Sequence, residues 1–239
     1  MPNRSSTRSR PSLETKVQPA QKRASETYEL LLDSAAKTLE EFGIERLSTN
    51  LVAERAGVTP PALYRYFPNK YALLSELGKR LMQRQNECIE RWIGPEVFAG
   101  GVATLEPAIA GLLLDTYKAT RKVEGGVWIM RAMRAVPALQ EVRLASHAAV
   151  TAAQARLLAQ ALPHVKRAEL QVLSRIAVEL IYAAVEMLFD AKLPPKTVAR
   201  IVGGMLASHL HRLAPESDTD LDEGLDTLGQ PAPSTAPER

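Results

Sequence analysis

The sequence predicts an all-α protein in which an N-terminal three-helix unit precedes a larger helical bundle. Apolar residues recur at helical spacing through most of the 239 residues, and Gly or Pro separates the successive stretches. The apolar–polar alternation and paired turn residues that strands and hairpins need are rare. The length allows one large or two modest domains with a proper core.

The first helix is predicted over residues 25–42. Leu31, Ala35 and Leu39 share one face of this stretch, and Gly43 follows where a left-handed helix end is expected. The spacing therefore gives this helix one apolar face to bury.

Short helices follow, because capping residues and breakers come close together. Ser48 or Thr49 can cap a second helix that stops at Gly57, and Thr59 can cap a third that two prolines open. Asn69 can cap a long fourth helix. This and the remaining helices are predicted at about 70–92, 105–121, 125–135, 137–162, 166–190 and 195–212.

The last two predicted helices are apolar around more than one stripe, which favours burial on two sides. A homodimer interface satisfies this pattern, and Gly203, Gly204 and Ala207 would permit close backbone approach. The alternative is that these helices are the central ones of a monomeric bundle.

Both ends of the chain are rich in Pro, Ser, Thr and charge, which predicts disorder. Residues 1–23 carry six Lys or Arg and one Glu, and residues 214–239 carry seven Asp or Glu and one Arg. The sequence thus predicts a disordered basic arm and a disordered acidic tail.

Residues 48–74 carry an ordered set of residue types at fixed spacing that resembles the DNA-binding signature of the TetR family of bacterial transcriptional regulators. The shared elements are Ala56-Gly57-Val58, Thr59, Leu63-Tyr64, Tyr66-Phe67, Asn69-Lys70 and Leu73-Leu74.

The resemblance implies a helix-turn-helix domain over residues 24–75 and an effector-binding and dimerisation domain over residues 76–213. It implies a homodimeric cytoplasmic repressor that binds a pseudo-palindromic double-stranded DNA operator and is released by a small-molecule effector. The alternative is a DNA-binding protein of the same kind that a protein partner regulates.

The resemblance also implies phosphate contacts from Thr49, Thr59, Tyr66 and Lys70, with Tyr64 at the groove. Physically, Val52, Ala53, Leu63 and Phe67 are spaced to pack the second and third helices, so that the third presents side chains to the bases.

The departure from the family pattern is Pro61, which with Pro60 removes two backbone donors from the start of the third helix. The methyl group of Ala62 can meet a thymine methyl, and Arg65 is the candidate for direct base reading. Contact with phosphate, or with solvent alone, is the alternative for Arg65.

Residues 24–91 hold nine Lys or Arg against ten Asp or Glu, so this unit alone does not attract a polyanion. Arg4, Arg8 and Arg10 could supply the attraction by reaching the adjacent minor groove. The alternative is a solubilising leader.

Bulky, adaptable side chains with a few polar tips are candidates to line an effector pocket, although core filling is the alternative for each. Arg131 and Arg134 could favour an anionic effector, or be surface charges. The candidates are Tyr117, Trp128, Met130, Arg131, Met133, Arg134, His147, Tyr182, Met187 and Phe189.

Catalysis is not expected. No two of the four histidines have the spacing of a shared metal site, and glycine-rich phosphate loops and nucleophile elbows are missing, so we expect no cofactor and no metal. Cys88 is interpreted as a structural thiol rather than a redox sensor. An apolar stretch long enough for a signal peptide or a membrane span is also missing, which favours the cytoplasm.

Overall fold

The computed structural model describes residues 11–17 and 21–213, and ten α-helices account for most of them. The all-α prediction is confirmed. The helices are α1 Lys22–Arg46, α2 Thr49–Arg55, α3 Pro60–Tyr66, α4 Lys70–Trp92, α5 Pro95–Ala99, α6 Gly101–Lys122, α7 Gly126–Ala135, α8 Pro137–Ala161, α9 Arg167–Asp190 and α10 Pro195–Arg212.

Local capping chemistry explains most of the boundaries. The Ser48 hydroxyl accepts from the backbone N–H of Leu51 at 3.2 Å, so Ser48 rather than Thr49 caps α2. Thr59 occupies the N-cap position of α3, but its side chain makes no capping bond. The sequence missed α5, because Pro95 was interpreted as a break whereas it opens this short helix.

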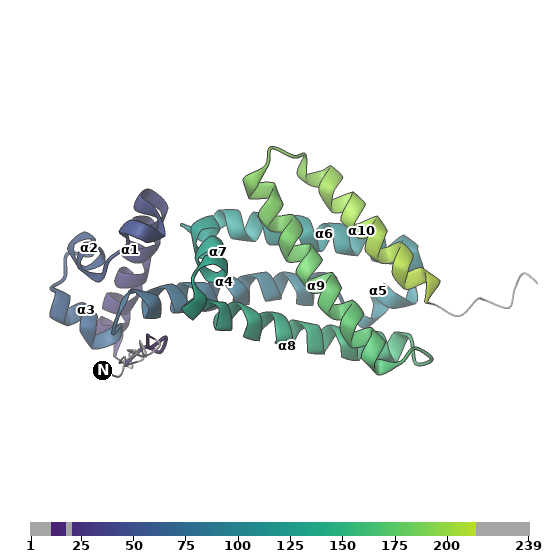
Figure 1. Ribbon diagram of the computed structural model, residues 1–239, viewed down its shortest axis with the longest axis horizontal. Coiled ribbons are helices and arrows are strands. Elements are labelled where there is room, and N and C mark those ends of the chain that lie inside the picture. The colour runs from purple at the N-terminus through teal and green to yellow at the C-terminus, as the bar shows by residue number, and fades with distance from the viewer. Residues whose placement is uncertain (1–10, 18–20, 214–239) are drawn as a thin grey trace, which may run out of the picture.

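Two parts of the molecule are distinct in Figure 1: a small unit of α1–α3 at one end and a bundle of α5–α10 at the other, joined by α4. The first turns of α4 belong to the small unit, and its later turns run beside α6 and α8. A displacement of α4 in the bundle would therefore reach the small unit.

Helix α7 supports the joint between the two parts. Met133 of α7 is fully buried against Gly78 of α4, where an added Cβ would lie 2.6 Å from the Met133 sulfur. The absence of a side chain at Gly78 allows the two helices to approach this closely.

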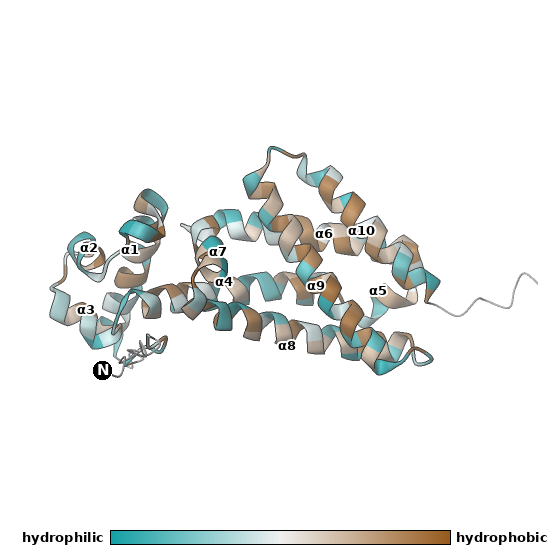
Figure 2. Cartoon of the chain, viewed as in Figure 1, coloured by the Kyte–Doolittle hydropathy of each residue, from teal (hydrophilic) through white to brown (hydrophobic). Residues whose placement is uncertain are grey.

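Figure 2 shows apolar and polar residues interspersed along the bundle helices, with long apolar stretches on α9 and α10. No helix in the described part of the chain is long and apolar enough to cross a membrane.

The small residues of α10 pack within the chain rather than on a partner. Gly203 is buried against α6, where an added Cβ would lie 2.7 Å from the carbonyl oxygen of Glu106, and Ala207 has no exposed surface. The prediction that these residues give a twin subunit close approach is therefore wrong for Gly203 and Ala207.

Candidate functional site

The α2–α3 unit is held by a small apolar core. Val52, Ala53, Leu63 and Phe67 are fully buried, as their spacing predicted. Tyr28 of α1 stacks on Phe67 with ring centroids 4.9 Å apart, and burial raises the pKa of Tyr28 to about 12. This core fixes how α3 is presented to solvent.

The outer face of α3 is open. Thr59, Pro60, Pro61 and Arg65 are exposed, and Ala62 next to them is half-buried. Because Pro60 and Pro61 carry no backbone N–H, side chains must make most of the polar contacts from this helix start.

Tyr64 links this face to the preceding helix. Its side chain is 40% exposed, and its hydroxyl lies 2.9 Å from that of Thr49 at the start of α2. Each hydroxyl keeps further hydrogen-bonding capacity, so together they form a polar edge beside the α3 face.

The structure gives Tyr66 and Lys70 internal roles that the sequence did not predict. Tyr66 is 5% exposed and packs edge-on against Tyr28. The Lys70 ammonium donates to the carbonyls of Leu47 at 3.2 Å and Ile44 at 3.4 Å, tying the end of α1 to the start of α4. The contacts of both side chains within the protein therefore hold the unit together.

An N-terminal segment, Pro11–Val17, lies along the end of α3. The backbone N–H of Lys16 donates to the Tyr66 carbonyl at 2.8 Å, and the Asn69 amide donates to the Ser12 carbonyl at 3.0 Å. The prediction of disorder is wrong for this segment and for residues 21–23, which belong to α1 or its cap. Arg4, Arg8 and Arg10 lie outside the described residues, as does the acidic tail.

Lys16 is a further candidate for contact with a ligand phosphate, and the sequence did not predict it. Its side chain is exposed, and its backbone is bonded to the last turn of α3. Only the tertiary placement of the segment revealed it, since a lone lysine in a polar leader carries no distinguishing pattern.

Several other cations of the unit are already paired. The Arg80 guanidinium donates to both carboxylate oxygens of Glu29, at 2.6 and 2.8 Å, which lowers the pKa of Glu29. Arg55 pairs with Glu41. Among the described residues Arg65 has no ion-pair partner, so it is free to meet an anion.

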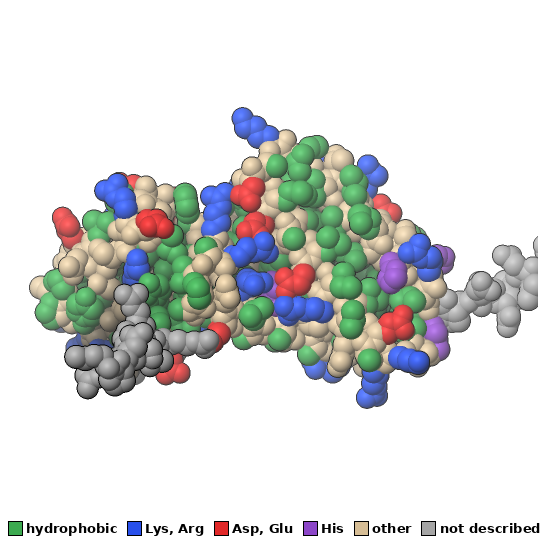
Figure 3. Space-filling view, viewed as in Figure 1, with side chains coloured by type: hydrophobic (Ala, Val, Ile, Leu, Met, Phe, Trp, Pro, Cys, Tyr) green, Lys and Arg blue, Asp and Glu red, His purple; other side chains and the backbone are tan. Residues whose placement is uncertain are grey.

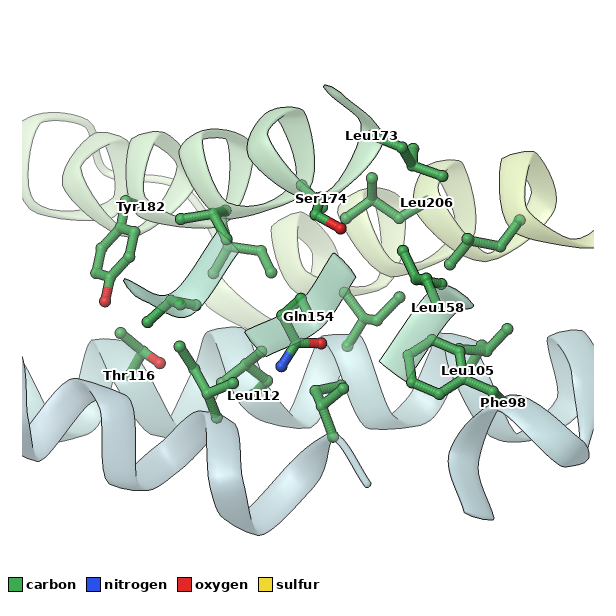
Figure 4. Close-up of a pocket in the computed structure, with 18 residues that line it drawn as sticks. Phe98, Leu105, Leu112, Thr116, Gln154, Leu158, Leu173, Ser174, Tyr182 and Leu206 are labelled. Carbon is green, nitrogen blue, oxygen red and sulfur yellow. The ribbon is translucent and has the colours of Figure 1, made fainter. Parts of the chain in front are cut away.

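The bundle contains an apolar cavity (Figure 4) formed by α4, α5, α6, α8, α9 and α10. The cavity volume is about 70 Å³. Its polar lining residues are Thr116, Gln154, Ser174 and Tyr182. Of the described residues that line it, none is charged.

Tyr182 is the one predicted pocket residue in this lining. Its ring stacks on His147 at 4.2 Å, and the Nδ1 atom of His147 lies 3.0 Å from a carboxylate oxygen of Glu179. Burial lowers the pKa of His147, and it also raises the pKa of Tyr182. His147 thus supports the cavity wall from behind.

The other predicted pocket residues lie elsewhere. Arg131 and Arg134 are on α7, outside the cavity lining, and pair with Asp190 and Glu186 of α9, each at 2.6 Å. Trp128 and Met187 are exposed, Met130 and Met133 belong to the main core, and Tyr117 packs on Phe189. Core or surface positions, the alternatives stated for these residues, are the ones observed.

The sequence missed Ser174, Gln154 and the aliphatic lining. Ser174 is 1% exposed, and its hydroxyl has no hydrogen-bond partner among the described residues. A serine inside an apolar helical stripe was the available signal, because a buried hydroxyl needs a partner.

A second surface lies on α9 and α10, where large apolar side chains face solvent. The exposed fractions are 60% for Val172, 55% for Ile176, 50% for Ile201 and 60% for Met205. Figure 3 shows hydrophobic side chains spread over this face of the bundle. We call these four residues the α9/α10 face.

Comparison with known proteins agrees with the geometry of the α2–α3 unit. The family model described as bacterial regulatory proteins, tetR family, matches residues 31–77, which cover most of α1, all of α2 and α3 and the first turns of α4. Residues 31–77 thus carry the similarity to the TetR family. This is a family of regulatory proteins, which agrees with the prediction that the chain is not an enzyme.

Curated TetR-family relatives share this part alone. The chain is 43% identical over 54 residues to the tetracycline repressor protein class C of Escherichia coli, covering 23% of this chain and 25% of the relative. It is 42% identical over 52 residues to the class A protein of transposon 1721, from the same organism, covering 22% and 24%. The chain thus matches about a quarter of the length of these relatives.

Solved structures share the fold over most of the chain. A putative TetR-family regulator from Rhodococcus sp. has a TM-score of 0.60 at 20% identity, over 78% of this chain and 100% of that one. The multidrug binding protein EbrR, complexed with imidazole, has a TM-score of 0.58 at 19% identity, over 85% and 100%. At this identity the likeness concerns the fold.

Proposed function

We propose that this chain is a DNA-binding transcriptional repressor of the TetR family that acts as a homodimer on a pseudo-palindromic operator and is released by a small molecule bound in its cavity. The open face of α3, in a unit that matches the family model, is the observation that carries this proposal. Such a protein acts where the chromosome is, which in a bacterium is the cytoplasm.

On DNA, α3 would enter the major groove. Arg65 would read a guanine or contact a phosphate, and the Ala62 methyl would meet a thymine methyl. Thr59, Tyr64 and Thr49 would contact phosphates beside the groove, together with Lys16 from the N-terminal segment. Arg4, Arg8 and Arg10 would extend this contact into the minor groove.

Dimerisation would supply the remaining specificity. A seven-residue helix is about 10 Å long and covers only a few base pairs, whereas two such helices related by a two-fold axis read half-sites about 34 Å apart. The α9/α10 face offers the apolar surface for this contact, since exposed apolar side chains gathered on one face are typical of an interaction site.

The cavity supports a small-molecule effector over regulation by a protein partner, because it is concave and apolar and is lined from six helices. Ile89 of α4 is one of its lining residues, and the same helix begins in the DNA-binding unit. A ligand that binds better to the dimer in which the two α3 helices are wrongly spaced for the operator would lower operator affinity. The factor is the same as that by which the operator lowers ligand affinity.

Fluorescence anisotropy tests the proposal. The purified chain is titrated against labelled DNA from the region upstream of its own gene, with scrambled competitor and at several salt concentrations. We expect competitor-resistant binding by two protomers per site. Binding that the scrambled DNA removes completely would contradict the proposal.

A matched pair of variants then tests the interface. We expect Arg65→Ala to weaken operator binding by roughly 5- to 150-fold, the loss of about 1–3 kcal/mol, if this side chain makes a bidentate base contact. Arg156→Ala removes an exposed arginine from α8 and should leave binding unchanged. Equal losses in both variants would show that α3 does not read the DNA.

A charge placed on the α9/α10 face tests the dimer. Met205→Glu should shift the chain from dimer to monomer in sedimentation analysis, because the carboxylate would be buried without a partner. Lys196→Glu, on the same helix and also exposed, is the charge control. A Met205→Glu protein that remains dimeric would place the interface elsewhere.

A further inference from the structure

The surface of the cavity is almost entirely apolar, and its few polar side chains lie in one half of it. Figure 4 shows Tyr182 and Thr116 at one end, Gln154 and Ser174 toward the middle, and Phe98 and Leu105 at the other end. The order along α6 agrees, since Leu105 and Thr116 are three turns apart on that helix. A ligand that fits both halves must itself be polar at one end and apolar at the other.

Charge is excluded from this space. The described lining residues are all uncharged, and the nearby carboxylate Glu179 is already paired with Arg143 at 3.6 Å, with Arg175 at 2.5 Å and with His147. An ion entering the cavity would lose its hydration and gain no counter-charge. The polar end of the ligand is therefore neutral.

Ser174 points to a hydrogen bond that the protein alone leaves unmade. Its hydroxyl is buried without a partner, which costs free energy until a ligand or a water pairs with it. The Tyr182 hydroxyl is only weakly engaged, donating to the Asn86 side chain at 3.4 Å. Tyr182 is more than two turns from Ser174 on α9, so one head group pairs with Ser174 and not with both. A neutral group that both donates and accepts, such as a hydroxyl, can make that bond.

The small volume of the cavity favours a flexible chain over a rigid ring system. The cavity volume of about 70 Å³ is several times what one water molecule requires, but it is too small for a rigid polycyclic ligand. An alkyl chain is slim and flexible, and the aliphatic lining matches it along its length.

We propose that the cavity is a site for a neutral single-chain amphiphile, whose hydroxyl-like head lies beside Ser174 and Gln154 and whose alkyl chain runs toward Phe98 and Leu105. This assignment rests on the proposed function in so far as the cavity is taken as the effector site. It differs from the anionic effector that Arg131 and Arg134 could have favoured, and it agrees with the alternative that they are surface charges.

Three probes of equal chain length test the head group. Isothermal titration of the full chain, without DNA, compares 1-decanol, decanoate and decyltrimethylammonium below their aggregation concentrations. We expect decanol to bind at least tenfold more tightly than either ion. Equal or tighter binding of decanoate or of the cationic probe would overturn the proposal, as would a failure of decanol to bind.

Variants locate the binding. Ser174→Ala should weaken decanol binding three- to tenfold, whereas Ser208→Ala, at an exposed serine of α10, should leave it unchanged. Ala177→Phe places a ring in the lining and should abolish binding. Far-ultraviolet circular dichroism melts confirm that each variant is folded. Decanol binding that survives in a folded Ala177→Phe protein would place it outside the cavity and refute the proposal.

The titration and the DNA assay fail independently. Head-group selectivity measured without DNA supports the ligand class even if no operator is found, in which case only the proposed function fails. Sequence-specific DNA binding together with no preference for decanol would support the proposed function and refute the ligand class.

Discussion

Asn69 connects the start of α4 with the N-terminal segment Pro11–Val17, and its replacement tests that connection. The side-chain oxygen accepts from the backbone N–H groups of Tyr71 and Ala72, at 2.9 and 3.0 Å, and its amide donates to the Ser12 carbonyl at 3.0 Å. One side chain therefore caps a helix and holds a segment 57 residues away in sequence.

Two substitutions separate these roles. Asn69→Ala loses the cap, worth about 1–2 kcal/mol, and the bond to Ser12, worth about 0.5–1.5 kcal/mol, so we expect the free energy of unfolding to fall by about 2–3 kcal/mol. Asn69→Asp keeps an acceptor for the cap, and its charge gains about 0.3–1 kcal/mol at the helix N-terminus, but it cannot donate to Ser12. We expect a loss of at most about 1 kcal/mol.

Urea unfolding at one fixed protomer concentration measures both differences, because self-association adds to apparent stability. Protection of the segment from proteolysis reports the Ser12 bond separately, and it should decrease in both variants. If Asn69→Asp is as unstable as Asn69→Ala, the capping hydrogen bonds are not the main contribution of Asn69 to the free energy of unfolding. If the segment stays equally protected in Asn69→Asp, the Ser12 bond does not hold it.

Two further outcomes follow from the packing and the buried histidine. Gly78→Ala should lower the free energy of unfolding by about 1 kcal/mol in the same urea assay, because crowding of Met133 costs about 1–3 kcal/mol and the helix-propensity gain is only about 1 kcal/mol. Gly204→Ala is the control: an added Cβ there has no neighbour nearer than 3.9 Å, so this variant should be more stable. Burial lowers the pKa of His147 below 6.5, so the unfolded state takes up a proton first as the pH falls through 6.5, and stability should decrease there until the lower folded pKa is reached. His147→Gln should remove this part of the pH dependence, which thermal melts across the range measure; an unchanged slope would contradict the assignment, with Glu179 contributing only below 4.5.

Helix positions were predictable from the sequence, because capping and periodicity are local. Asn69 starts α4 where the spacing placed it, and the predicted boundaries of α7 to α10 agree with the structure within one residue. The short α5 was missed because a proline after a glycine is equally typical of a break and of a helix start.

The candidate site was only partly predictable. The exposed α3 face follows from the motif, since Leu63 and Phe67 must be buried and the residues between them point outward. The cavity lining does not follow in the same way. Periodicity gave Tyr182 an inward face but could not distinguish a cavity wall from a packed core, and nine other predicted residues lie outside the lining.

The sequence by itself determined the all-α class, the order of most helices and the α2–α3 unit, because each depends on residues close together in the chain. The tertiary structure alone decided that Lys70 bonds backbone carbonyls, that Gly203 packs on α6 and that Ser174 stands unpaired in an uncharged cavity. Helical spacing specifies which face of a helix is apolar, but the partner of that face is set by packing between segments distant in sequence.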